Sequence, residues 1–399
     1  MKYCIIVPDG LADRPLQRLD GKTCVEVART PNLDALSQEG LLGMVCTIPH
    51  GFHPGSDVAN LSIVGYDPAR YYSGRAPLEA MNMGVELSET DWALRCNLTT
   101  VSDGKMSDFT AGHISNSEGE LLIKAIQEKL GADDITFYPG VSYRNLMVYR
   151  GSLPMELETT PPHDIVGQVI DGHLPRGKGA ELLLDLMNRS IPILAEHEVN
   201  RVRLDLEQNP ANMIWLWGQG RRPYMESFQE RYGVTGAAIS AVDLVRGIAK
   251  SIGWDVINVP GATGYIDTDY AAKGRYALGA LKSHDLVFVH IEATDEAGHE
   301  SNMTHKIRAM ENIDKLIIGP IKQHAAETGN LRIMVLPDHA TPISVGTHVD
   351  DPVPFVIWDP LSAPRSGKDF SEVNAAMSGI MLKEGHRLME HFLKGVWEF

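Results

Sequence analysis

The stretch Asp285-Leu-Val-Phe-Val-His-Ile-Glu292-Ala-Thr-Asp295-Glu-Ala-Gly-His299 decides the fold of this chain. Its first half is a continuous apolar run of strand length, and its second half carries acidic and imidazole side chains. A run of this kind, bounded by polar residues, is typical of a strand that is buried within a sheet. We therefore expect a buried strand that delivers polar groups just beyond its carboxyl end.

Two other segments repeat this pattern. Residues 3–7 form an apolar run before Pro8-Asp9-Gly10, and residues 331–337 form another before Asp338-His339. Between these strands we expect a helix at 236–252, a short strand at 255–259, and a helix at 304–318 that Thr304 caps. Buried strands that alternate with helices predict an α/β fold, with a mainly parallel sheet covered by helices on both faces.

The middle of the chain has a different pattern. Turn signals are frequent between residues 92 and 210, and only 117–130 and 179–187 have strong helical patterns. The 399 residues are enough for two or three domains at roughly 150 residues each. We expect a discontinuous α/β domain, residues 1–91 and 211–399, interrupted by a smaller inserted α+β domain, residues 92–210.

Composition excludes several classes of protein. The hydrophobic fraction of 43% and the charged fraction of 22% are ordinary for a folded chain and exclude a mainly disordered one, a collagen-like repeat and a coiled coil. The 36 Lys and Arg against 52 Asp and Glu give a net charge of −16, which argues against nucleic-acid binding. An anionic substrate stays possible, because a few arginines or a metal ion reverse the sign of the charge locally.

Cysteine content and hydropathy bear on the compartment. Four cysteines without a C-x-x-C pair indicate free thiols and no disulfide framework. The first residues do not resemble a signal peptide, and no stretch reaches the ~18 apolar residues of a membrane span. We expect a cytoplasmic protein without a membrane or nucleic-acid partner; its oligomeric state stays open.

Polar side chains follow all three buried strands. The carboxyl ends of parallel strands meet at one edge of a sheet, where ligands bind in open α/β folds. One such side chain alone is more often a turn or cap residue, but the joint pattern favours two metal ions with mixed carboxylate and imidazole ligands. Such ligands suit Mn or Zn better than Mg or Ca. The candidate ligands are Asp9, Asp295, His299, Asp338, His339 and, from a later loop, His348.

A second informative segment is Gly51-Phe-His-Pro-Gly-Ser56-Asp-Val-Ala-Asn60-Leu-Ser-Ile-Val-Gly65. It predicts a tight turn into a helix, with Ser56 at the helix N-terminus, where backbone N–H groups suit an anion. A serine hydroxyl becomes a nucleophile only when a base or a metal activates it, and two nearby metals would do so. The alternative, that Ser56 only caps the helix, is equally compatible with these residues.

Motifs along nearly the whole chain resemble those of the alkaline phosphatase superfamily, and more closely those of its archaeal-type cofactor-independent phosphoglycerate mutases. They are Val7-Pro-Asp9-Gly10, Thr30-Pro-Asn-Leu-Asp34, Gly55-Ser56-Asp57, Leu61-Ser-Ile-Val-Gly-Tyr-Asp67, Tyr72-Ser-Gly-Arg75-Ala-Pro-Leu-Glu79, Asp295-Glu-Ala-Gly-His299 and Asp338-His339. The resemblance implies an alkaline phosphatase-like fold and an enzyme that interconverts 3-phosphoglycerate and 2-phosphoglycerate in glycolysis and gluconeogenesis, without 2,3-bisphosphoglycerate.

The resemblance also implies a role for each matching residue. Ser56 would accept the phosphoryl group and return it to the 2-hydroxyl of glycerate. One divalent metal would be held by Asp295, His299 and His348, and the other by Asp9, Ser56, Asp338 and His339. Mn is the expected metal, with Zn or Mg as alternatives. For contacts to the anionic substrate we consider His113, Arg144, Arg150 and Lys273.

Two departures from the family pattern leave the substrate open. Relatives carry a histidine where this chain has Asn60, and an arginine-rich Asp-Arg-Arg-Ala-Gly-Arg stretch where it has Asp108-Phe-Thr-Ala-Gly-His113. A bacterial branch with such features has been proposed to consist of homoserine kinases, so a homoserine kinase-like phosphotransferase of threonine biosynthesis is the main alternative. A second alternative is a non-catalytic metal-binding protein on the same fold.

Overall fold

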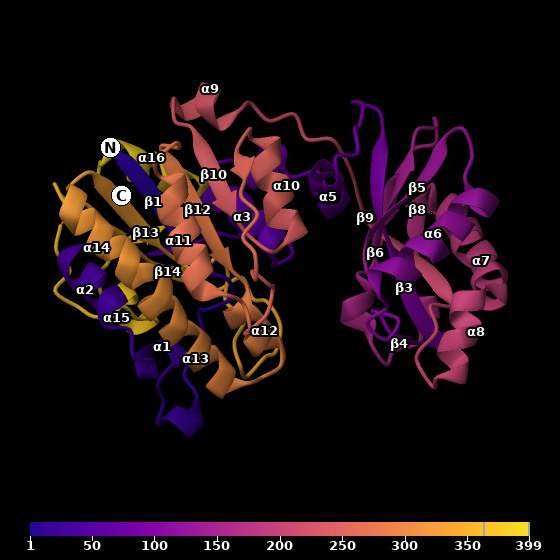
Figure 1. Ribbon diagram of the computed structural model, residues 1–399, viewed down its shortest axis with the longest axis horizontal. Helices are drawn as coiled ribbons and strands as arrows, with labels where there is room; N and C mark the ends of the chain where they lie inside the picture. The colour runs from indigo at the N-terminus through magenta and orange to yellow at the C-terminus, as the bar shows by residue number, and fades with distance from the viewer. Residues whose placement is uncertain (362–363, 398–399) are drawn as a thin grey trace. The chain divides into compact units, whose positions relative to one another are not determined.

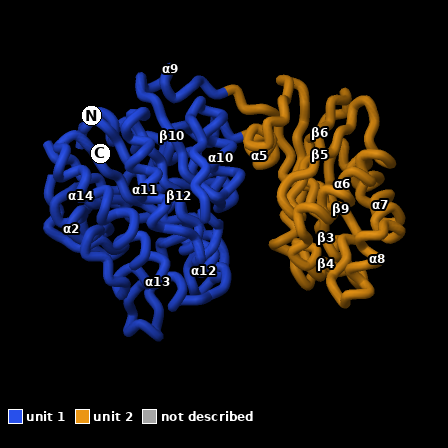
Figure 2. Tube along the Cα trace, viewed as in Figure 1, with its two compact units in different colours: residues 1–72, 225–399 blue, residues 73–224 orange. Residues whose placement is uncertain are grey.

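The computed structural model describes residues 1–361 and 364–397, and the chain divides into two compact units. Unit 1 consists of residues 1–72 and 225–399, and unit 2 consists of residues 73–224 (Figure 2). The inserted domain expected at 92–210 therefore lies within unit 2.

Unit 1 is built on one large sheet. In chain order its strands are β1 (Lys2–Pro8), β2 (Leu41–Val45), β10 (Gly236–Ile239), β11 (Asp255–Val256), β12 (Leu286–Ile291), β13 (Leu331–Val335), β14 (Val353–Trp358) and β15 (Met381–Leu382). The spatial order is β11-β10-β12-β1-β13-β14-β2-β15. Figure 1 labels β10, β12, β1, β13 and β14 of this sheet. The ladder from β11 to β13 is parallel, whereas β14 runs antiparallel to both of its neighbours. The sheet is thus mainly parallel, as expected.

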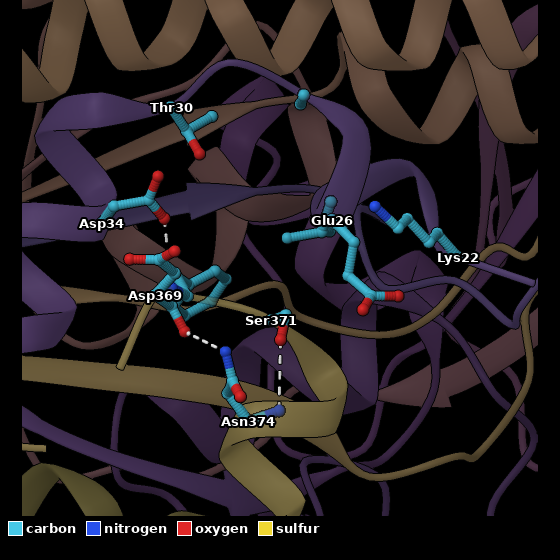
Figure 3. A pocket seen from close by; sticks show the side chains of 10 residues that line it. Lys22, Glu26, Thr30, Asp34, Asp369, Ser371 and Asn374 are labelled. Atoms are coloured by element: carbon cyan, nitrogen blue, oxygen red, sulfur yellow. Dashed lines mark hydrogen bonds between the residues drawn. The ribbon is translucent and has the colours of Figure 1, made fainter. Parts of the chain in front are cut away.

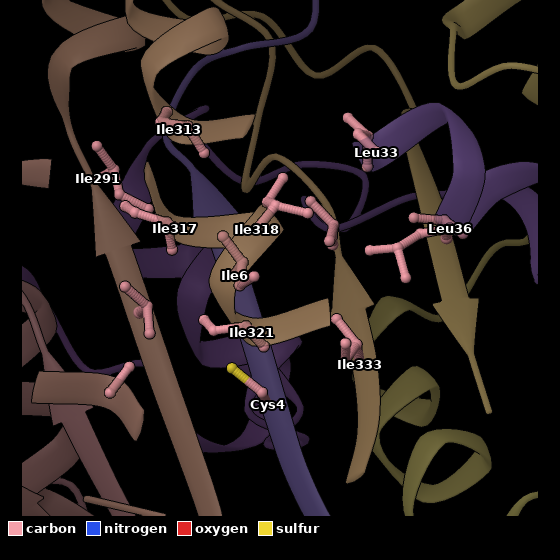
Figure 4. Packing of buried hydrophobic residues seen from close by; sticks show 14 of the residues in the cluster. Cys4, Ile6, Leu33, Leu36, Ile291, Ile313, Ile317, Ile318, Ile321 and Ile333 are labelled. Carbon is pink, nitrogen blue, oxygen red and sulfur yellow. The ribbon is translucent and has the colours of Figure 1, made fainter. Parts of the chain in front are cut away.

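Helices cover both faces of this sheet. On one face, Cys4 and Ile6 of β1 are fully buried among aliphatic side chains of neighbouring strands and helices (Figure 4). Burying each large aliphatic side chain contributes roughly 1.5–3 kcal/mol, which makes this cluster a main source of stability. On the other face, Tyr3 packs edge-to-face against Phe392 of α16 (Leu388–Lys394). The first face is covered by α2 (Pro31–Glu39), α11 (Tyr270–Ala280), α13 (Met303–Ile313), a π-helical turn (Asp314–Ile318) and α14 (Gly319–Thr328).

The expected helix at 236–252 is wrong in its first half. Residues 236–239 form the buried strand β10, and the helix that follows, α10 (Asp243–Ser251), begins only at Asp243. Gly236, Ala237 and Ala238 are small, and β10 fits between β11 and β12; a Cβ on Gly236 would lie 2.2 Å from the indole nitrogen of Trp254. The small residues of β10 therefore allow its neighbours to pack closely against it. The sequence periodicity that predicted a helix does not reveal this role.

The cap expected for the helix at 304–318 is also wrong. The side chain of Asn302 accepts a hydrogen bond from the backbone N–H of His305 and so caps α13, which Thr304 does not. The remaining helices of unit 1 are α1 (Cys24–Val27), α3 (Ser56–Ile63), α4 (Pro68–Tyr71), α9 (Phe228–Tyr232), α12 (Ala293–His299) and α15 (Glu372–Ala376), with 3₁₀ turns at Gln17–Leu19 and Gly385–Arg387.

Unit 2 is an antiparallel α+β structure. Its main sheet contains β3 (Trp92–Ser102), β4 (Lys105–Asp108), β5 (Ile135–Val141), β6 (Arg144–Tyr149) and β9 (Met213–Arg221), and β3 pairs with β4, β6 and β9. Leu94, Cys96 and Leu98 of β3 lie in a hydrophobic cluster shared with the helices on one face. These helices include α6 (Asn116–Leu130) and α7 (Ala180–Glu196), followed by α8 (Glu198–Asp205); β7 (Glu156–Glu158) pairs with β8 (Arg176–Lys178), and 3₁₀ turns lie at Pro162–Ile165 and Ile170–His173.

The other face of the unit 2 sheet explains where this unit begins. Ala76 and Ala80 of α5 (Arg75–Met83) pack against Ala93 and Leu146 of the sheet. Residues 73–91, which precede the limit expected from the sequence, therefore belong to unit 2 through packing. At the other end, β9 pairs with β3 as far as Arg221, so the unit continues beyond residue 210.

Candidate active site

Three adjacent parallel strands end at the same edge of the unit 1 sheet. β1 lies between β12 and β13, with Val7 in register with His290 and Ile6 in register with Val335. Asp9 follows β1, α12 with its acidic and imidazole residues follows β12, and Asp338 follows β13. This topology brings together side chains that are more than 280 residues apart in the chain, such as His339 and Ser56.

The first group of candidate ligands consists of Asp9, Asp338 and His339, all buried, with ligand atoms within 4.8 Å of one another. His339 Nε2 lies 3.4 Å from Asp9 Oδ1 and 3.6 Å from Asp338 Oδ2. Burial, together with the negative charges of Asp338 and Asp295, raises the pKa of Asp9 well above its ordinary value. Burial lowers the pKa of His339 to about 4, so its imidazole is neutral and offers a lone pair at neutral pH.

The second group consists of Asp295, His299 and His348. The two imidazole Nε2 atoms are 3.0 Å apart and lie 3.2 Å and 3.5 Å from the Asp295 carboxylate. Burial lowers the pKa of His299, but its contact with the Asp295 carboxylate outweighs this and raises the pKa to about 9. Two imidazoles thus point at one carboxylate, an arrangement that holds a proton or a metal ion.

The two groups are neighbours. The His348 ring lies 4.7 Å from the ring of His299 and 4.2 Å from the ring of His339, measured between centroids. Gly10 makes the close approach possible: its φ is +59°, and a Cβ there would lie 2.3 Å from Asp295 Oδ1. A side chain at position 10 would therefore separate the end of β1 from the Asp295 carboxylate.

Ser56 joins the first group from another element. It is the first residue of α3, and its Oγ lies 3.1 Å from His339 Nε2. Gly55 occupies the N-cap position of α3, and no side chain caps this helix. The Ser56 hydroxyl therefore does not cap the helix but faces the imidazole of His339. At the helix N-terminus beside it, the Val58 N–H donates to Asp57 Oδ1, whereas the N–H groups of Ser56 and Asp57 make no hydrogen bond among the described residues and can bind an anion.

The donor set fits two divalent cations. Asp9 Oδ1 is buried and makes no hydrogen bond among the described residues, which is costly for a carboxylate oxygen unless a cation binds there. Three buried carboxylates, Asp9, Asp295 and Asp338, lie close enough to influence one another, so positive charge would stabilise all of them. Mixed oxygen and nitrogen donors of this kind suit Mn or Zn.

Two polar residues near the first group escaped the sequence analysis as site residues. Asn60, one helical turn after Ser56, donates from Nδ2 to the Ser56 carbonyl at 2.9 Å and to Asp338 Oδ2 at 2.8 Å. His290 lies within β12, with Nε2 3.2 Å from Asp9 Oδ2. The available signals were the i,i+4 spacing of Asn60 from Ser56, and an imidazole within an otherwise apolar strand.

The four cationic candidates are dispersed. In unit 1, Lys273 is fully buried, and its Nζ donates to the backbone carbonyl of His290 at 3.0 Å. Burial lowers the pKa of Lys273 to about 8. In unit 2, Arg144 is exposed at the start of β6, while Arg150 pairs with Asp91 at 3.4 Å and bonds to two strand β5 hydroxyls. His113 is exposed and has a φ of 50° in the loop before α6.

Unit 2 contains a cationic cluster around the candidate Arg144, and its member Arg95 was not identified from the sequence. The Arg95 guanidinium lies 4.6 Å from the Trp217 ring centroid, with its Nε 3.0 Å from Glu79 Oε2. Arg75 Nε lies 3.3 Å from the other oxygen of Glu79. Burial, with Arg75 and Arg144 adding positive charge and Glu79 opposing, lowers the pKa of Arg95 to about 10. Arg75 and Arg95 share the Glu79 carboxylate and Arg144 adds positive charge near Arg95, so this cluster has an excess of positive charge that suits an anion.

A separate pocket in unit 1 contains further acidic residues and lies among α1, α2 and the segment before α15 (Figure 3). Asp34 accepts a hydrogen bond from the Phe370 N–H at 3.2 Å, and Asn374 donates to the Asp369 carbonyl at 3.0 Å. None of the candidate ligands lines this pocket. In addition, no helix among the described residues is long and apolar enough to cross a membrane.

Comparison with known proteins gives a consistent result. A model of the family described as 2,3-bisphosphoglycerate-independent phosphoglycerate mutase matches residues 37–200. The chain is 50% identical over 382 residues to the 2,3-bisphosphoglycerate-independent phosphoglycerate mutase of Methanosarcina acetivorans, and the matched region covers 96% of each chain. Among solved structures, a protein from Pyrococcus horikoshii matches with a TM-score of 0.82 at 29% identity, covering 100% of this chain and 98% of the other. The cofactor-independent phosphoglycerate mutase of Thermoplasma acidophilum matches with a TM-score of 0.66 at 28% identity, covering 99% of both chains.

Proposed function

The chain belongs to the family of 2,3-bisphosphoglycerate-independent phosphoglycerate mutases, and on this premise we propose that it interconverts 3-phosphoglycerate and 2-phosphoglycerate through a phosphoserine at Ser56. The observation that carries the proposal is the approach of Ser56 Oγ to His339 Nε2 at 3.1 Å, beside two buried carboxylates. The enzyme would serve glycolysis and gluconeogenesis and act in the cytoplasm, where this substrate is a metabolite.

Two divalent ions, with Mn²⁺ as the expected metal and Zn²⁺ or Mg²⁺ as alternatives, complete the site. When bound, they would lower the pKa of the serine hydroxyl and stabilise negative charge on the transferring phosphoryl group. We assign one ion to Asp295, His299 and His348, and the other to Asp9, Ser56, Asp338 and His339.

Ser56 acts as nucleophile in the first half-reaction. Its Oγ attacks the phosphorus of 3-phosphoglycerate, a P–Oγ bond forms, and the bond between phosphorus and the 3-oxygen breaks. The proton of the serine hydroxyl ends on the 3-oxygen, which leaves as a hydroxyl of glycerate. In the second half-reaction the 2-hydroxyl attacks the phosphoserine, the P–Oγ bond breaks, and the 2-hydroxyl proton returns to Ser56.

The surroundings of Ser56 support this role. The N-terminus of α3 presents backbone N–H groups and a positive dipole end to the phosphoryl oxygens. Asn60 holds the Ser56 carbonyl and the Asp338 carboxylate with one amide group, so nucleophile and ligand keep a fixed relation. The serine is therefore preorganised for attack, which is where enzymes gain much of their rate.

Cationic side chains would bind the carboxylate and the phosphate of the substrate. Of the residues considered from the sequence, namely His113, Arg144, Arg150 and Lys273, we favour Arg144, because its guanidinium is exposed and lies near the arginine cluster. Arg150 is occupied by Asp91 and two hydroxyls, which makes it the weakest candidate. We add Arg75 and Arg95 of the unit 2 cluster, since arginine binds carboxylate and phosphate groups with two parallel hydrogen bonds.

The test is a parallel assay of the purified protein with Mn²⁺ by ³¹P NMR. One sample contains 3-phosphoglycerate, and the other contains homoserine and ATP. Conversion of 3-phosphoglycerate to 2-phosphoglycerate at an enzymatic rate supports the proposal. Formation of phosphohomoserine without mutase turnover would favour the homoserine kinase alternative, and no turnover in either sample would favour a non-catalytic metal-binding protein.

A further inference from the structure

His290 is a buried imidazole to which no role has been assigned. It is fully buried in β12, within the run Leu286-Val-Phe-Val-His-Ile291. The register of β1 and β12 places His290 opposite Val7, and side chains alternate along a strand. His290 therefore lies on the face opposite that of Val287 and Val289, which belong to the hydrophobic core. A polar ring at zero exposure costs free energy unless both nitrogens find partners.

The two nitrogens of this ring face different groups. Nε2 lies 3.2 Å from Asp9 Oδ2 and 4.0 Å from Asp338 Oδ2, and it makes no aligned hydrogen bond with any described residue. Nδ1 lies 3.4 Å from the hydroxyl oxygen of Ser240, the residue that follows β10. The backbone on this strand is held as well, because Lys273 Nζ donates to the His290 carbonyl at 3.0 Å.

The groups around the ring favour a proton at Nε2, because a bare Nε2 would turn its lone pair toward the carboxylates of Asp9 and Asp338, while Ser240 faces Nδ1 with a hydroxyl that can donate. Its Oγ already accepts the backbone N–H of Val242 at 3.0 Å, and Ser240 is buried at 5% exposure. The hydroxyl hydrogen is then available to donate, and the facing acceptor is Nδ1 of His290. An imidazole that accepts at Nδ1 carries its proton at Nε2 in the neutral form. That proton points toward the carboxylates of Asp9 and Asp338.

We propose that His290 is a positioning residue for Asp9: Nε2 carries the proton and, 3.2 Å from Asp9 Oδ2, donates to it when a cation occupies Oδ1, whereas without the cation this contact is not aligned. The proposal rests on the assignment of Asp9 to the Ser56-side metal. Together with Asn60, which donates to Asp338 Oδ2, it gives each carboxylate of this metal group a neutral hydrogen-bond donor. Hydrogen-bond donors behind metal ligands orient these ligands. Removing such a donor commonly weakens metal binding about 10- to 100-fold.

The first test measures metal binding in the full chain. Mn²⁺ is titrated into chelator-treated protein, and free Mn²⁺ is followed by EPR. We expect the wild type to bind two ions and His290→Leu to bind one ion normally and the other about 10- to 100-fold more weakly. His290→Gln, whose amide nitrogen can take the place of Nε2, should restore most of the affinity, and Ser240→Ala should cause a smaller loss. The proposal would be overturned if His290→Leu bound each of the two ions with the same affinity as the wild type does.

The second test needs no metal and no variant that risks misfolding. The tautomer of His290 is read from ¹⁵N chemical shifts and long-range ¹H–¹⁵N couplings of the wild type, with His290→Gln used to assign the signal. We expect a ring protonated at Nε2. A ring protonated at Nδ1, with Nε2 bare, would overturn the proposal, because such a ring cannot donate to Asp9.

These results are distinguishable from those that test the proposed function. A wild type that binds two Mn²⁺ ions, shows the expected tautomer and loses one site in His290→Leu supports the role of His290 even when mutase activity is absent. Mutase activity with two ions bound equally well by His290→Leu supports the function and rejects the positioning role. A wild type that binds only one ion also rejects it.

Discussion

The two units treat their charged residues in different ways. In unit 1, Asp9, Asp295 and Asp338 follow three neighbouring parallel strands and meet at one edge of the sheet. In unit 2, Arg144 begins strand β6 and Arg150 follows its end, so the two lie at opposite ends of one antiparallel strand; Arg144 is exposed and Arg150 is held by Asp91. Parallel strands bring all their carboxyl ends to one side, whereas antiparallel strands alternate their ends. The position of a residue after a strand therefore carries more information in unit 1 than in unit 2.

The two units also differ in the sign of their excess charge: negative in the carboxylate groups of unit 1 and positive in the arginine cluster of unit 2. The unit 1 groups crowd buried carboxylates together, and burial with mutual repulsion raises the pKa of Asp9. In the unit 2 cluster, Arg75 and Arg95 contact Glu79 and Arg144 lies near Arg95, and burial with neighbouring cations lowers the pKa of Arg95. The unit 1 groups are thus suited to cations and the unit 2 cluster to an anion.

The largest effect is expected for the nucleophile in unit 1. Ser56→Ala should reduce mutase turnover by on the order of 10³-fold or more, because the phosphoryl group loses its acceptor. Intact-mass analysis after brief exposure to 3-phosphoglycerate should show an added phosphoryl group on the wild type and none on the variant. The fold should stay intact, since the Asp295, His299 and His348 group does not contain the serine.

Ser62→Ala is the matched control for this substitution. Ser62 lies on the same helix, α3, and its buried hydroxyl makes no hydrogen bond among the described residues. Its removal should leave turnover and phosphorylation unchanged. An active Ser56→Ala variant would contradict the covalent mechanism. So would a Ser62→Ala variant that is folded as stably as Ser56→Ala and yet inactive, because loss of activity would then not be specific to Ser56.

The second largest effect is expected on metal removal. Exhaustive chelation should abolish turnover and lower the melting temperature, because ions that bind only the folded chain stabilise it, by about 2.7 kcal/mol at 100 times Kd. Differential scanning calorimetry and metal analysis measure both, and Mn²⁺ should restore them best. Dialysed protein that contains no metal and gains neither stability nor activity from any divalent ion would show the ligand assignment to be wrong.

A moderate effect is expected in unit 2, where it would sharpen the contrast between the two units. Arg144→Gln should raise KM for 3-phosphoglycerate about tenfold, which corresponds to about 1.4 kcal/mol, because a charged hydrogen bond to the substrate is lost. Binding of Mn²⁺ should be unchanged, since Arg144 lies in the other unit from the ligands. Steady-state kinetics and Mn²⁺ titration provide the two readouts.

Arg189→Gln serves as its control. Arg189 is an exposed residue of α7 in the same unit and pairs with Asp185 at 3.0 Å, a surface contact of little energetic weight. Its KM should equal that of the wild type. Equal KM values for Arg144→Gln and the wild type would remove Arg144 from the substrate site.

The smallest effect is expected in the acidic pocket of unit 1, away from the candidate ligands (Figure 3). Burial, opposed by the Phe370 N–H and assisted by Asp369 and Asp314, raises the pKa of Asp34 from an ordinary 3.8 to about 6. The folded chain then holds this proton more tightly than the unfolded chain. The resulting stability is complete below pH 3.8 and is lost as the pH rises through about 6.

Asp34→Asn removes this titration. Its melting temperature relative to the wild type should rise between pH 4.5 and pH 7, by no more than roughly 2 °C because the carboxyl is half-exposed. Turnover at neutral pH should not change. The exposed Asp20→Asn variant is the control, and an identical pH profile of stability for Asp34→Asn and the wild type would refute the assignment.

Much of unit 1 was predictable from the sequence alone. Three apolar runs, each followed by Asp or Asp and His, predicted parallel strands whose polar ends lie at one edge, and the structure brings Asp9, Asp295 and Asp338 together there. The prediction was possible because strand length, burial and the direction of a parallel strand are local properties of the chain. The same local pattern mistook residues 236–239 for helix, since small apolar residues fit either element.

Other features were decided only by tertiary structure. Neither the hydrogen bond from Asn60 to Asp338, nor the contact between Ser240 and His290, nor the packing of α5 on the unit 2 sheet follows from spacing along the chain. Each depends on the distance between atoms on elements that are far apart in sequence, set by strand register and by the packing of side chains in three dimensions. Hydrogen bonds act over about 3 Å, so a residue's partner is known only when the fold has placed it.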